Sequence, residues 1–307
     1  MTGGWQRLGR LPLDVAAAPW AVTHAALPMI EAIADGVWHV YLSLRDQEGR
    51  ARIGRTSLTL DPAPWLGPLA ADPVLDVGTL GAFDDSGVTS SCLVAHGDRR
   101  YLFYTGWSRG VTVPFYLSAG LAISERNEPF RRVSPAPLFD RSAVDPFLTA
   151  SPYVLIEEGR WRMWYISGTG WTRVADGTRH AYHIRYAESA DGHAWTREGR
   201  VCVDYASPSE HAFARPCVLR DGNLYRMWYA VRGDRYRIGY AESNDGFRWR
   251  RLDDQGGLGR GVESWEDDMV EYPCVFDWRG DRYMLYNGND YGKTGVGLAR
   301  WVTAVPD

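Results

Sequence analysis

The amino-acid sequence predicts an all-β protein built from a repeated unit of four short strands. Three observations support this prediction: a motif that recurs along the chain, the alternation of apolar and polar residues inside it, and the lack of a capped helical stripe in any 11-residue window. The 307 residues include 14 Trp, 17 Tyr and 33 Gly. Many aromatic residues beside many glycines are typical of short strands joined by tight turns, so we expect little helix.

The repeat is clearest in the second half of the chain. Residues 162–165 read RMWY and recur at 226–229, and residues 184–192 (IRYAESADG) recur at 238–246 as IGYAESNDG. The earlier copy has a longer loop, from Gly168 to about His180. Weaker copies of the first motif stand at residues 38–41, 101–104 and 283–286. The five copies lie about 50 to 65 residues apart, which is the spacing of propeller blades.

Each copy can be divided into four strands. In the third copy, a short apolar run at residues 153–156 is followed by an alternating segment at 161–165. The third strand ends at the turn pair Asp191-Gly192, and residues 194–197 form the fourth. Five such units predict a five-bladed β-propeller in one domain. The expected blades cover approximately residues 24–80, 84–140, 145–205, 210–258 and 263–303.

The last copy lacks a fourth strand, and the N-terminus supplies a candidate. Residues 4–10 (GWQRLGR) resemble residues 194–200 (AWTREGR), which include the fourth strand of the third copy. We predict that the N-terminal strand completes the last blade and closes the ring, because this pairing removes an exposed sheet edge.

Composition excludes several classes of partner. The net charge of −4 argues against nucleic acid. No run of about 18 apolar residues is present to cross a membrane, and the N-terminal residues do not read as a secretion signal. The four cysteines lack metal-binding spacing, and Cys92, Cys217 and Cys274 begin first strands as expected for small buried residues. We expect a cytoplasmic protein without metal or cofactor, and the oligomeric state stays open.

The first strands of a propeller line its central channel, so the segments that lead into them should form a funnel with the binding site. Carboxylates that converge in such a funnel have divergent pKa values, as acid–base catalysis of glycoside hydrolysis requires. Asp145 and Glu210 do not recur at equivalent positions, which favours a functional role. The candidate catalytic residues are Asp84, Asp85, Asp145, Glu210, Asp268 and His24. The candidate substrate-binding residues are Ser151, His211, Arg215, Glu271, Lys293 and the rim aromatics Trp107, Trp171 and Tyr291.

Five units whose inner strands mostly follow an acidic residue resemble the superfamily of arabinanases, β-xylosidases, invertases and levansucrases. The resemblance implies that Asp145, in residues 144–146 (VDP), braces the transition state and that Glu210 is the general acid. The Asp expected on the first blade is not matched, and His24 stands in its place. The missing base can then be Asp84 or Asp85, Asp268 or Glu271, or His24 itself.

The expected function is therefore that of a glycoside hydrolase-like enzyme with a carbohydrate or other small-molecule substrate. The unmatched Asp leaves two alternatives: a cyclase, lyase or hydrolase that tailors a small molecule in a biosynthetic pathway, or a carbohydrate-binding propeller without catalysis. The sequence determines neither the substrate nor the stereochemical outcome.

Overall fold

The structure is a computed structural model that describes residues 3–126, 128–175 and 177–303. Within these residues the chain is almost entirely β, and the helical segments are the short α1 (Asp253–Gly256), α2 (Asn289–Gly292) and a 3-10 turn at Val15–Ala17. The expectation of little helix is confirmed. None of these helices is long and apolar enough to cross a membrane.

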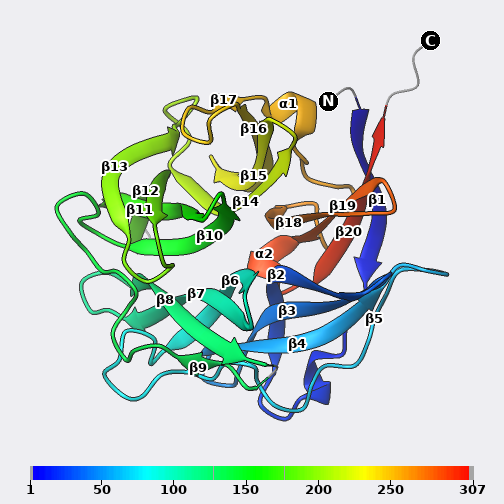
Figure 1. Ribbon diagram of the computed structural model, residues 1–307, viewed down its shortest axis with the longest axis horizontal. Helices are drawn as coiled ribbons and strands as arrows, with labels where there is room; N and C mark the ends of the chain where they lie inside the picture. The colour runs from blue at the N-terminus through cyan, green and yellow to red at the C-terminus, as the bar shows by residue number, and fades with distance from the viewer. Residues whose placement is uncertain (1–2, 127, 176, 304–307) are drawn as a thin grey trace.

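The strands pair in antiparallel groups of four, arranged around a common centre in Figure 1. Group 1 contains β2 (Thr23–Ala34), β3 (Val37–Arg45), β4 (Ala51–Thr59) and β5 (Trp65–Leu66). Group 2 contains β6 (Gly87–His96), β7 (Arg99–Arg109), β8 (Phe115–Glu125) and β9 (Arg131–Arg132). Group 3 contains β10 (Thr149–Glu157), β11 (Arg160–Val174), β12 (Gly177–Ser189) and β13 (Thr196–Val203). Group 4 contains β14 (Ala212–Asp221), β15 (Leu224–Arg232), β16 (Tyr236–Ser243) and β17 (Arg250–Arg251).

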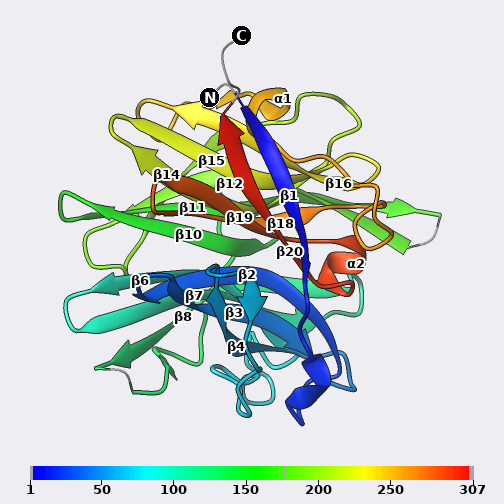
Figure 2. The ribbon, with the colours of Figure 1, turned by 90° about the vertical axis from the view of Figure 1, so that its right-hand side faces the viewer.

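The last group joins the two ends of the chain. It contains β18 (Glu271–Trp278), β19 (Asp281–Asn287) and β20 (Val296–Thr303), and β20 pairs antiparallel with β1 (Gly3–Leu11). Figure 2 shows β1 lying along β20 over its whole length. The predicted pairing of the N-terminal strand with the last copy is confirmed, with one more residue at each end than the sequence indicated.

The first strands of the groups form the inner part of the molecule. β2, β6, β10, β14 and β18 each contact the next in chain order, and β18 also contacts β2. Between the groups lie large buried aromatic residues such as Trp164 and Trp228. Each first strand is therefore held on both sides, which gives the centre of the molecule a fixed geometry.

The cysteines are packing residues, as predicted. All four are free and buried, and three of them lie on β6, β14 and β18. Cys92 Sγ accepts a hydrogen bond from the backbone N–H of Val154 at 3.4 Å, and burial raises the pKa of Cys92 to about 12. A thiol with so high a pKa is inert at neutral pH.

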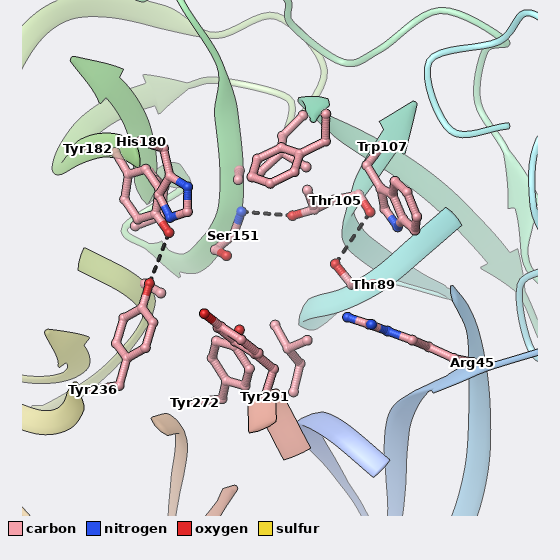
Figure 3. A pocket seen from close by; sticks show the side chains of 16 residues that line it. Arg45, Thr89, Thr105, Trp107, Ser151, His180, Tyr182, Tyr236, Tyr272 and Tyr291 are labelled. Atoms are coloured by element: carbon pink, nitrogen blue, oxygen red, sulfur yellow. Dashed lines mark hydrogen bonds between the residues drawn. The ribbon is translucent and has the colours of Figure 1, made fainter. Parts of the chain in front are cut away.

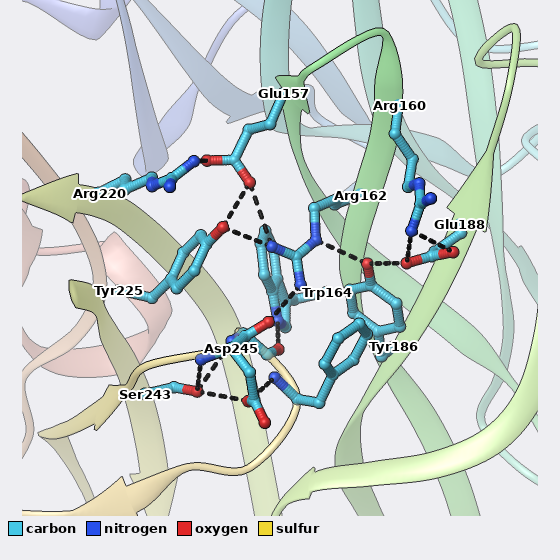
Figure 4. A network of polar contacts seen from close by, with 12 residues as sticks. Glu157, Arg160, Arg162, Trp164, Tyr186, Glu188, Arg220, Tyr225, Ser243 and Asp245 are labelled. Carbon is cyan, nitrogen blue, oxygen red and sulfur yellow. Dashed lines mark hydrogen bonds and ion pairs between the residues drawn. The ribbon is translucent and has the colours of Figure 1, made fainter. Parts of the chain in front are cut away.

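Polar side chains join groups 3 and 4 near the outside of the molecule (Figure 4). Arg162 donates to the hydroxyl of Tyr186 at 2.7 Å and to Glu157 at 3.1 Å, and the hydroxyl of Tyr225 donates to Glu157 at 2.7 Å. Each of these charged groups already has an opposite charge or a hydrogen-bonding hydroxyl as its partner. The network therefore has a structural role and is not a ligand site.

Candidate active site

A pocket of about 410 Å³ opens at the centre of the molecule, where the first strands of all five groups meet side chains from other elements (Figure 3). Its size lies within the range of small-molecule sites. Its lining is formed by Leu27, Arg45, Thr89, Thr105, Trp107, Phe115, Leu117, Ala150, Ser151, Ile166, His180, Tyr182, Ala214, Tyr236, Tyr272 and Tyr291. Aromatic and aliphatic faces dominate the wall, and hydroxyl groups are the most frequent polar atoms.

Bulges in the first strands place three of these residues. Leu27, Ser151 and Tyr272 each precede a proline, and their φ angles are 51°, 47° and 57°. The strand register shifts at each of these positions. A positive φ is unfavourable for residues other than glycine, and such strain is frequent at binding sites. The bulge directs an inner-strand side chain into the pocket.

The hairpin of β11 and β12 builds the wall on one side. His180 and Tyr182 stack in parallel with their ring centres 4.9 Å apart, and the hydroxyl of Tyr182 lies 3.0 Å from that of Tyr236. Trp171 packs against Phe115 and His180, so it supports the wall from behind. Burial lowers the pKa of His180 to about 4, with a further contribution from the charge of Arg232, so this imidazole is neutral at pH 7.

No carboxylate is among the described residues that line the pocket. Asp145 is fully buried and accepts hydrogen bonds from the Tyr165 hydroxyl at 3.1 Å and from Arg197 at 2.5 Å. Asp84 is bonded in the same way, to Tyr104 at 3.0 Å and to Arg132 at 2.7 Å. Asp145 has partners at both oxygens, and Asp84 has them at Oδ2 while its buried Oδ1 has none. Neither carboxylate lines the pocket, so their predicted catalytic roles have no support in the geometry.

Glu210 is held by arginines. It forms ion pairs with Arg251 at 2.6 Å and Arg237 at 3.0 Å and accepts from the backbone N–H of Ala206 at 2.7 Å. These contacts outweigh burial and lower the pKa of Glu210 to about 2. A carboxyl group with this pKa carries no proton at neutral pH, so we correct its assignment as the general acid.

These contacts form a recurring arrangement, which we call a latch: a carboxylate before the first strand, a tyrosine on the second and an arginine on the fourth. In group 5 the latch consists of Glu266, the Tyr286 hydroxyl, which donates to it at 2.9 Å, and Arg7 on β1, which donates to it at 3.0 Å. The carboxylate precedes its tyrosine by 20 residues in groups 2, 3 and 5. In group 4, Arg251 bridges Glu210 and Asp253, and Asp253 accepts from Tyr229.

The inference that Asp145 does not repeat was therefore wrong, because Asp84 and Glu266 occupy equivalent positions. The constant spacing between carboxylate and tyrosine was the sequence signal that could have revealed it.

The remaining predicted residues divide between the pocket and its surroundings. Asp85 accepts from the backbone of Gly81 and from the hydroxyl of Ser86, and Asp268 forms a surface ion pair with Arg235. Neither belongs to the pocket lining, so the structure gives no support to either as a base. Trp107, Ser151 and Tyr291 line the pocket, and their role in ligand binding stays a prediction.

The guanidinium of Arg215 is already bonded within the protein and is not available to a ligand. It is buried and donates to the backbone carbonyls of Ser90 at 2.8 Å, Pro28 at 2.6 Å and Ser91. The guanidinium thereby ties the inner strands β2 and β6 to β14. We therefore correct the prediction of a substrate-binding role, because a group that binds three carbonyls has a structural task.

The two predicted histidines lie beside the pocket and outside its lining. His24 is half-buried, and burial together with the charges of Arg45 and Lys293 lowers its pKa to about 4. Burial also lowers the pKa of His211, whose Nδ1 lies 3.3 Å from the carbonyl oxygen of Ser209. Lys293 is exposed near His24.

Glu271 is the carboxyl group whose surroundings are unusual. It is fully buried at the start of β18, and neither of its oxygens has a hydrogen-bond partner of ordinary geometry in the part of the chain that the structure describes. Burial raises the pKa of Glu271 well above its usual value, and Arg232 and the Tyr272 hydroxyl offset only part of this rise. Burial therefore favours the protonated form of this group. Glu271 lies close enough to the pocket wall to contribute to the raised pKa values of Tyr182 and Tyr236.

Sequence reasoning missed several lining residues, including Arg45, Thr89, Thr105, His180, Tyr182 and Tyr236. Most of them come from second and third strands, which we did not expect to reach the funnel. The longer loop of the third copy, ending at about His180, was the available signal, because it became the hairpin that carries His180 and Tyr182. Across the described residues, no group of three or more His, Cys, Asp or Glu side chains is placed to hold a metal ion.

Comparison with solved structures defines the class of fold. A glycosyl hydrolase from Bacteroides ovatus matches with a TM-score of 0.72 and 16% identity over 100% of this chain and 97% of its own. A thermostable family-43 glycoside hydrolase matches with a TM-score of 0.68 and 15% identity over 93% and 91%. A variant of the Bombyx mori family-32 β-fructofuranosidase BmSUC1 in complex with sucrose matches at 0.60 and 14% over 90% and 61%. The chain therefore has the propeller fold of these glycoside hydrolases, and the predicted resemblance is confirmed at the level of fold.

Sequence comparison places the chain in a narrower family. It is 43% identical over 295 residues to the uncharacterized proteins MT1551 and Rv1502 of two Mycobacterium tuberculosis strains, CDC 1551 / Oshkosh and ATCC 25618 / H37Rv. The match covers 96% of this chain and 98% of each relative, so the chain belongs to the family of these mycobacterial proteins. No protein-family model matches it.

Proposed function

We propose that the protein is a glycosidase-like enzyme that acts on a small sugar or glycoside in the central pocket. In this proposal the five strand groups are the blades of one closed propeller, over approximately residues 24–80, 84–140, 145–205, 210–258 and 263–303 with β1 completing the last. The contacts of β18 with β2 and the pairing of β1 with β20 support a closed ring.

The observation that carries the proposal is the composition of the pocket wall. Flat faces of Trp107, Tyr272 and Tyr291 suit the apolar C–H faces of a sugar ring. Hydroxyl groups of Thr89, Thr105 and Ser151 and of the wall tyrosines suit its hydroxyls. A concave site of this size with a few placed polar groups is typical of small-molecule binding.

Glu271 is our candidate for the proton donor. Cleavage of a glycosidic bond needs an acid that protonates the leaving oxygen, and this acid must hold its proton at the working pH. Burial raises the pKa of Glu271 and so favours its protonated form. Glu271 does not itself line the pocket, so its proton would pass through the neighbouring Tyr272 hydroxyl, which does: Tyr272 would donate its proton to the leaving oxygen and take the proton of Glu271. Water would attack the sugar carbon, and His180, whose imidazole lines the pocket in the neutral form, is the candidate acceptor of the water proton.

A panel of nitrophenyl glycosides and short oligosaccharides tests this proposal. Wild-type protein should release the aglycone or a free sugar from at least one of them. The variant Glu271→Gln should lose turnover by about 100-fold or more, since general acid catalysis contributes typically 10²–10⁴-fold. Its melting temperature and sugar binding should not fall.

The control is Glu263→Gln, which makes the same chemical change at an exposed residue of the preceding loop. It should retain full turnover. A Glu271→Gln variant with undiminished turnover would remove Glu271 from the mechanism.

The lining without a carboxylate favours a second candidate, a propeller that binds carbohydrate without catalysis. Retaining and inverting glycosidases both use carboxyl groups at the scissile bond. Saturable sugar binding, with no product from any member of the panel and no effect of Glu271→Gln, would support this candidate over the enzyme.

A further inference from the structure

A smaller chamber of about 60 Å³ adjoins the central pocket on the side of group 1. It shares Leu27, Arg45, Thr89, Trp107, Tyr272 and Tyr291 with the pocket lining. Ala26, Ser43 and Ala51 complete its wall. We call this space the side chamber. It exceeds the share of liquid volume of one water molecule, about 30 Å³, so it has room for a substituent of a few atoms.

Arg45 is the charged residue of the side chamber. It is the last residue of β3, where its backbone carbonyl accepts from the N–H of Val22 at 2.8 Å. Figure 3 shows its guanidinium extending into the pocket beside Thr89. No ion pair or side-chain hydrogen bond joins Arg45 to any other described residue, although the neighbouring Asp46 pairs with Arg50 and Arg52.

The latch arginines set the standard for comparison. Arg132 and Arg197 lie 2.7 and 2.5 Å from their carboxylates, and Arg7 lies 3.0 Å from Glu266. The protein thus supplies a carboxylate wherever an arginine has a structural task in this arrangement. Arg45 is exposed and lines a cavity instead, and its five donors have no partner among the described residues, so a ligand can replace water there.

The charges around the side chamber have one predominant sign. Arg45 and Lys293 both lie close enough to lower the pKa of His24, and Arg232 donates to the Tyr291 hydroxyl at 2.9 Å. The nearby carboxylate, Asp290, is exposed and acts on His24 in the opposite direction. Glu271 is buried behind the wall, outside the lining of the side chamber, and burial raises its pKa and favours its neutral form.

We propose that Arg45 and the side chamber form a subsite for an oxyanion, a phosphate or carboxylate group carried by the ligand of the central pocket. The planar guanidinium fork matches two oxygens of such a group, and the hydroxyls of Thr89, Tyr272 and Tyr291 can donate to the third oxygen of a phosphate. The inference makes the proposed substrate an acidic sugar, such as a sugar phosphate or a uronic acid. This inference depends on the proposed function only for the claim that the rest of the ligand is a sugar.

Titration calorimetry at constant ionic strength can test the subsite directly. The probes are inorganic phosphate, glucose, glucuronate and glucose 6-phosphate. The wild-type protein should bind inorganic phosphate, and Arg45→Gln should weaken this binding by about tenfold or more, the value of a hydrogen bond to a charged group. Arg45→Lys should fall between the two, because it keeps the charge and loses the fork. Arg248→Gln removes the same charge from an exposed position in group 4 and should bind phosphate like the wild type.

The outcomes distinguish an anionic group on the sugar from a free anion, and they distinguish failure of the subsite from failure of the proposed enzyme function. Tighter binding of glucose 6-phosphate or glucuronate than of both glucose and inorganic phosphate supports an anionic substituent. Phosphate binding that equals that of glucose 6-phosphate supports a subsite for the free anion. The subsite is overturned if Arg45→Gln and the wild type bind the anionic probes equally well. It is also overturned if no anionic probe binds the wild type. Arg45-dependent phosphate binding without turnover of any glycoside would leave the subsite standing and remove the enzyme proposal.

Discussion

The latches and the central pocket use the same kinds of residue in opposite ways. In the latch of group 3, Asp145, Tyr165 and Arg197 are partners of one another, and no polar group is left over for a ligand. At the pocket, Arg45 has no carboxylate partner, and Glu271, buried behind the lining, has no hydrogen-bond partner of ordinary geometry among the residues described. Polar residues that recur in this chain hold the sheets together. Arg45 and Glu271, which do not recur, lack such partners, whereas Arg215, which also does not recur, is bonded to three backbone carbonyls.

This difference follows from the electrostatics of burial. A charge taken out of water is tolerated only when an opposite charge or several hydrogen bonds replace the lost hydration. Asp145 is fully buried and has such partners. Glu271 is equally buried without them, and it avoids the cost by keeping its proton. A carboxyl group in that state is available for proton transfer or for hydrogen bonding to a ligand.

The largest effect is expected from breaking a latch. Asp145→Ala would leave Arg197 and Arg185 without their buried partner, and removal of one partner of a buried ion pair typically costs about 3–5 kcal/mol. Denaturant unfolding measures this loss. The control is Asp268→Ala, whose ion pair with Arg235 is exposed and should cost less than about 1 kcal/mol. Equal losses in the two variants would contradict the latch as a stabilising element.

A somewhat smaller effect is expected at Glu210. Its pKa is about 2 in the folded protein against a reference of 4.5, and this difference corresponds to about 3 kcal/mol of stability at neutral pH. Because the folded pKa is the lower one, the contribution is complete above pH 4.5 and is lost as the pH falls toward 2. The stability difference between wild type and Glu210→Gln should therefore be constant from pH 7 to 5 and shrink below pH 4.5. A stable Glu210→Gln variant that lost only turnover would restore the general acid role.

The repeat made much of the fold predictable from the sequence. The strand-rich composition, the turn pairs and the resemblance of residues 4–10 to residues 194–200 indicated the four-stranded groups and the pairing of β1 with β20. Those features depend on local periodicity and on burial of one face, which a sequence displays directly.

The site was less predictable because its polar groups are selected by geometry. Asp145 and Arg215 look like ligand-binding residues until their partners, Arg197 from a fourth strand and the carbonyls of β2 and β6, are known. Conversely, His180 and Tyr182 lie on a hairpin whose length is visible in the sequence. The sequence does not show that this hairpin turns toward the pocket. Whether a charged side chain meets a partner depends on contacts between residues far apart in the chain.

The smallest expected effect distinguishes the tyrosines of the two regions. Tyr165→Phe removes a hydroxyl that donates to a buried carboxylate, which typically costs about 1.5–3 kcal/mol. Tyr182→Phe removes a hydroxyl that shares one neutral hydrogen bond with Tyr236, and it should cost only about 1 kcal/mol. Thermal unfolding would rank the two losses, and calorimetry with the sugar that binds the wild type would rank the affinities in the reverse order. If Tyr165→Phe weakened sugar binding more than Tyr182→Phe did, latch and pocket would not be separate, because the latch would then contribute to the binding surface itself.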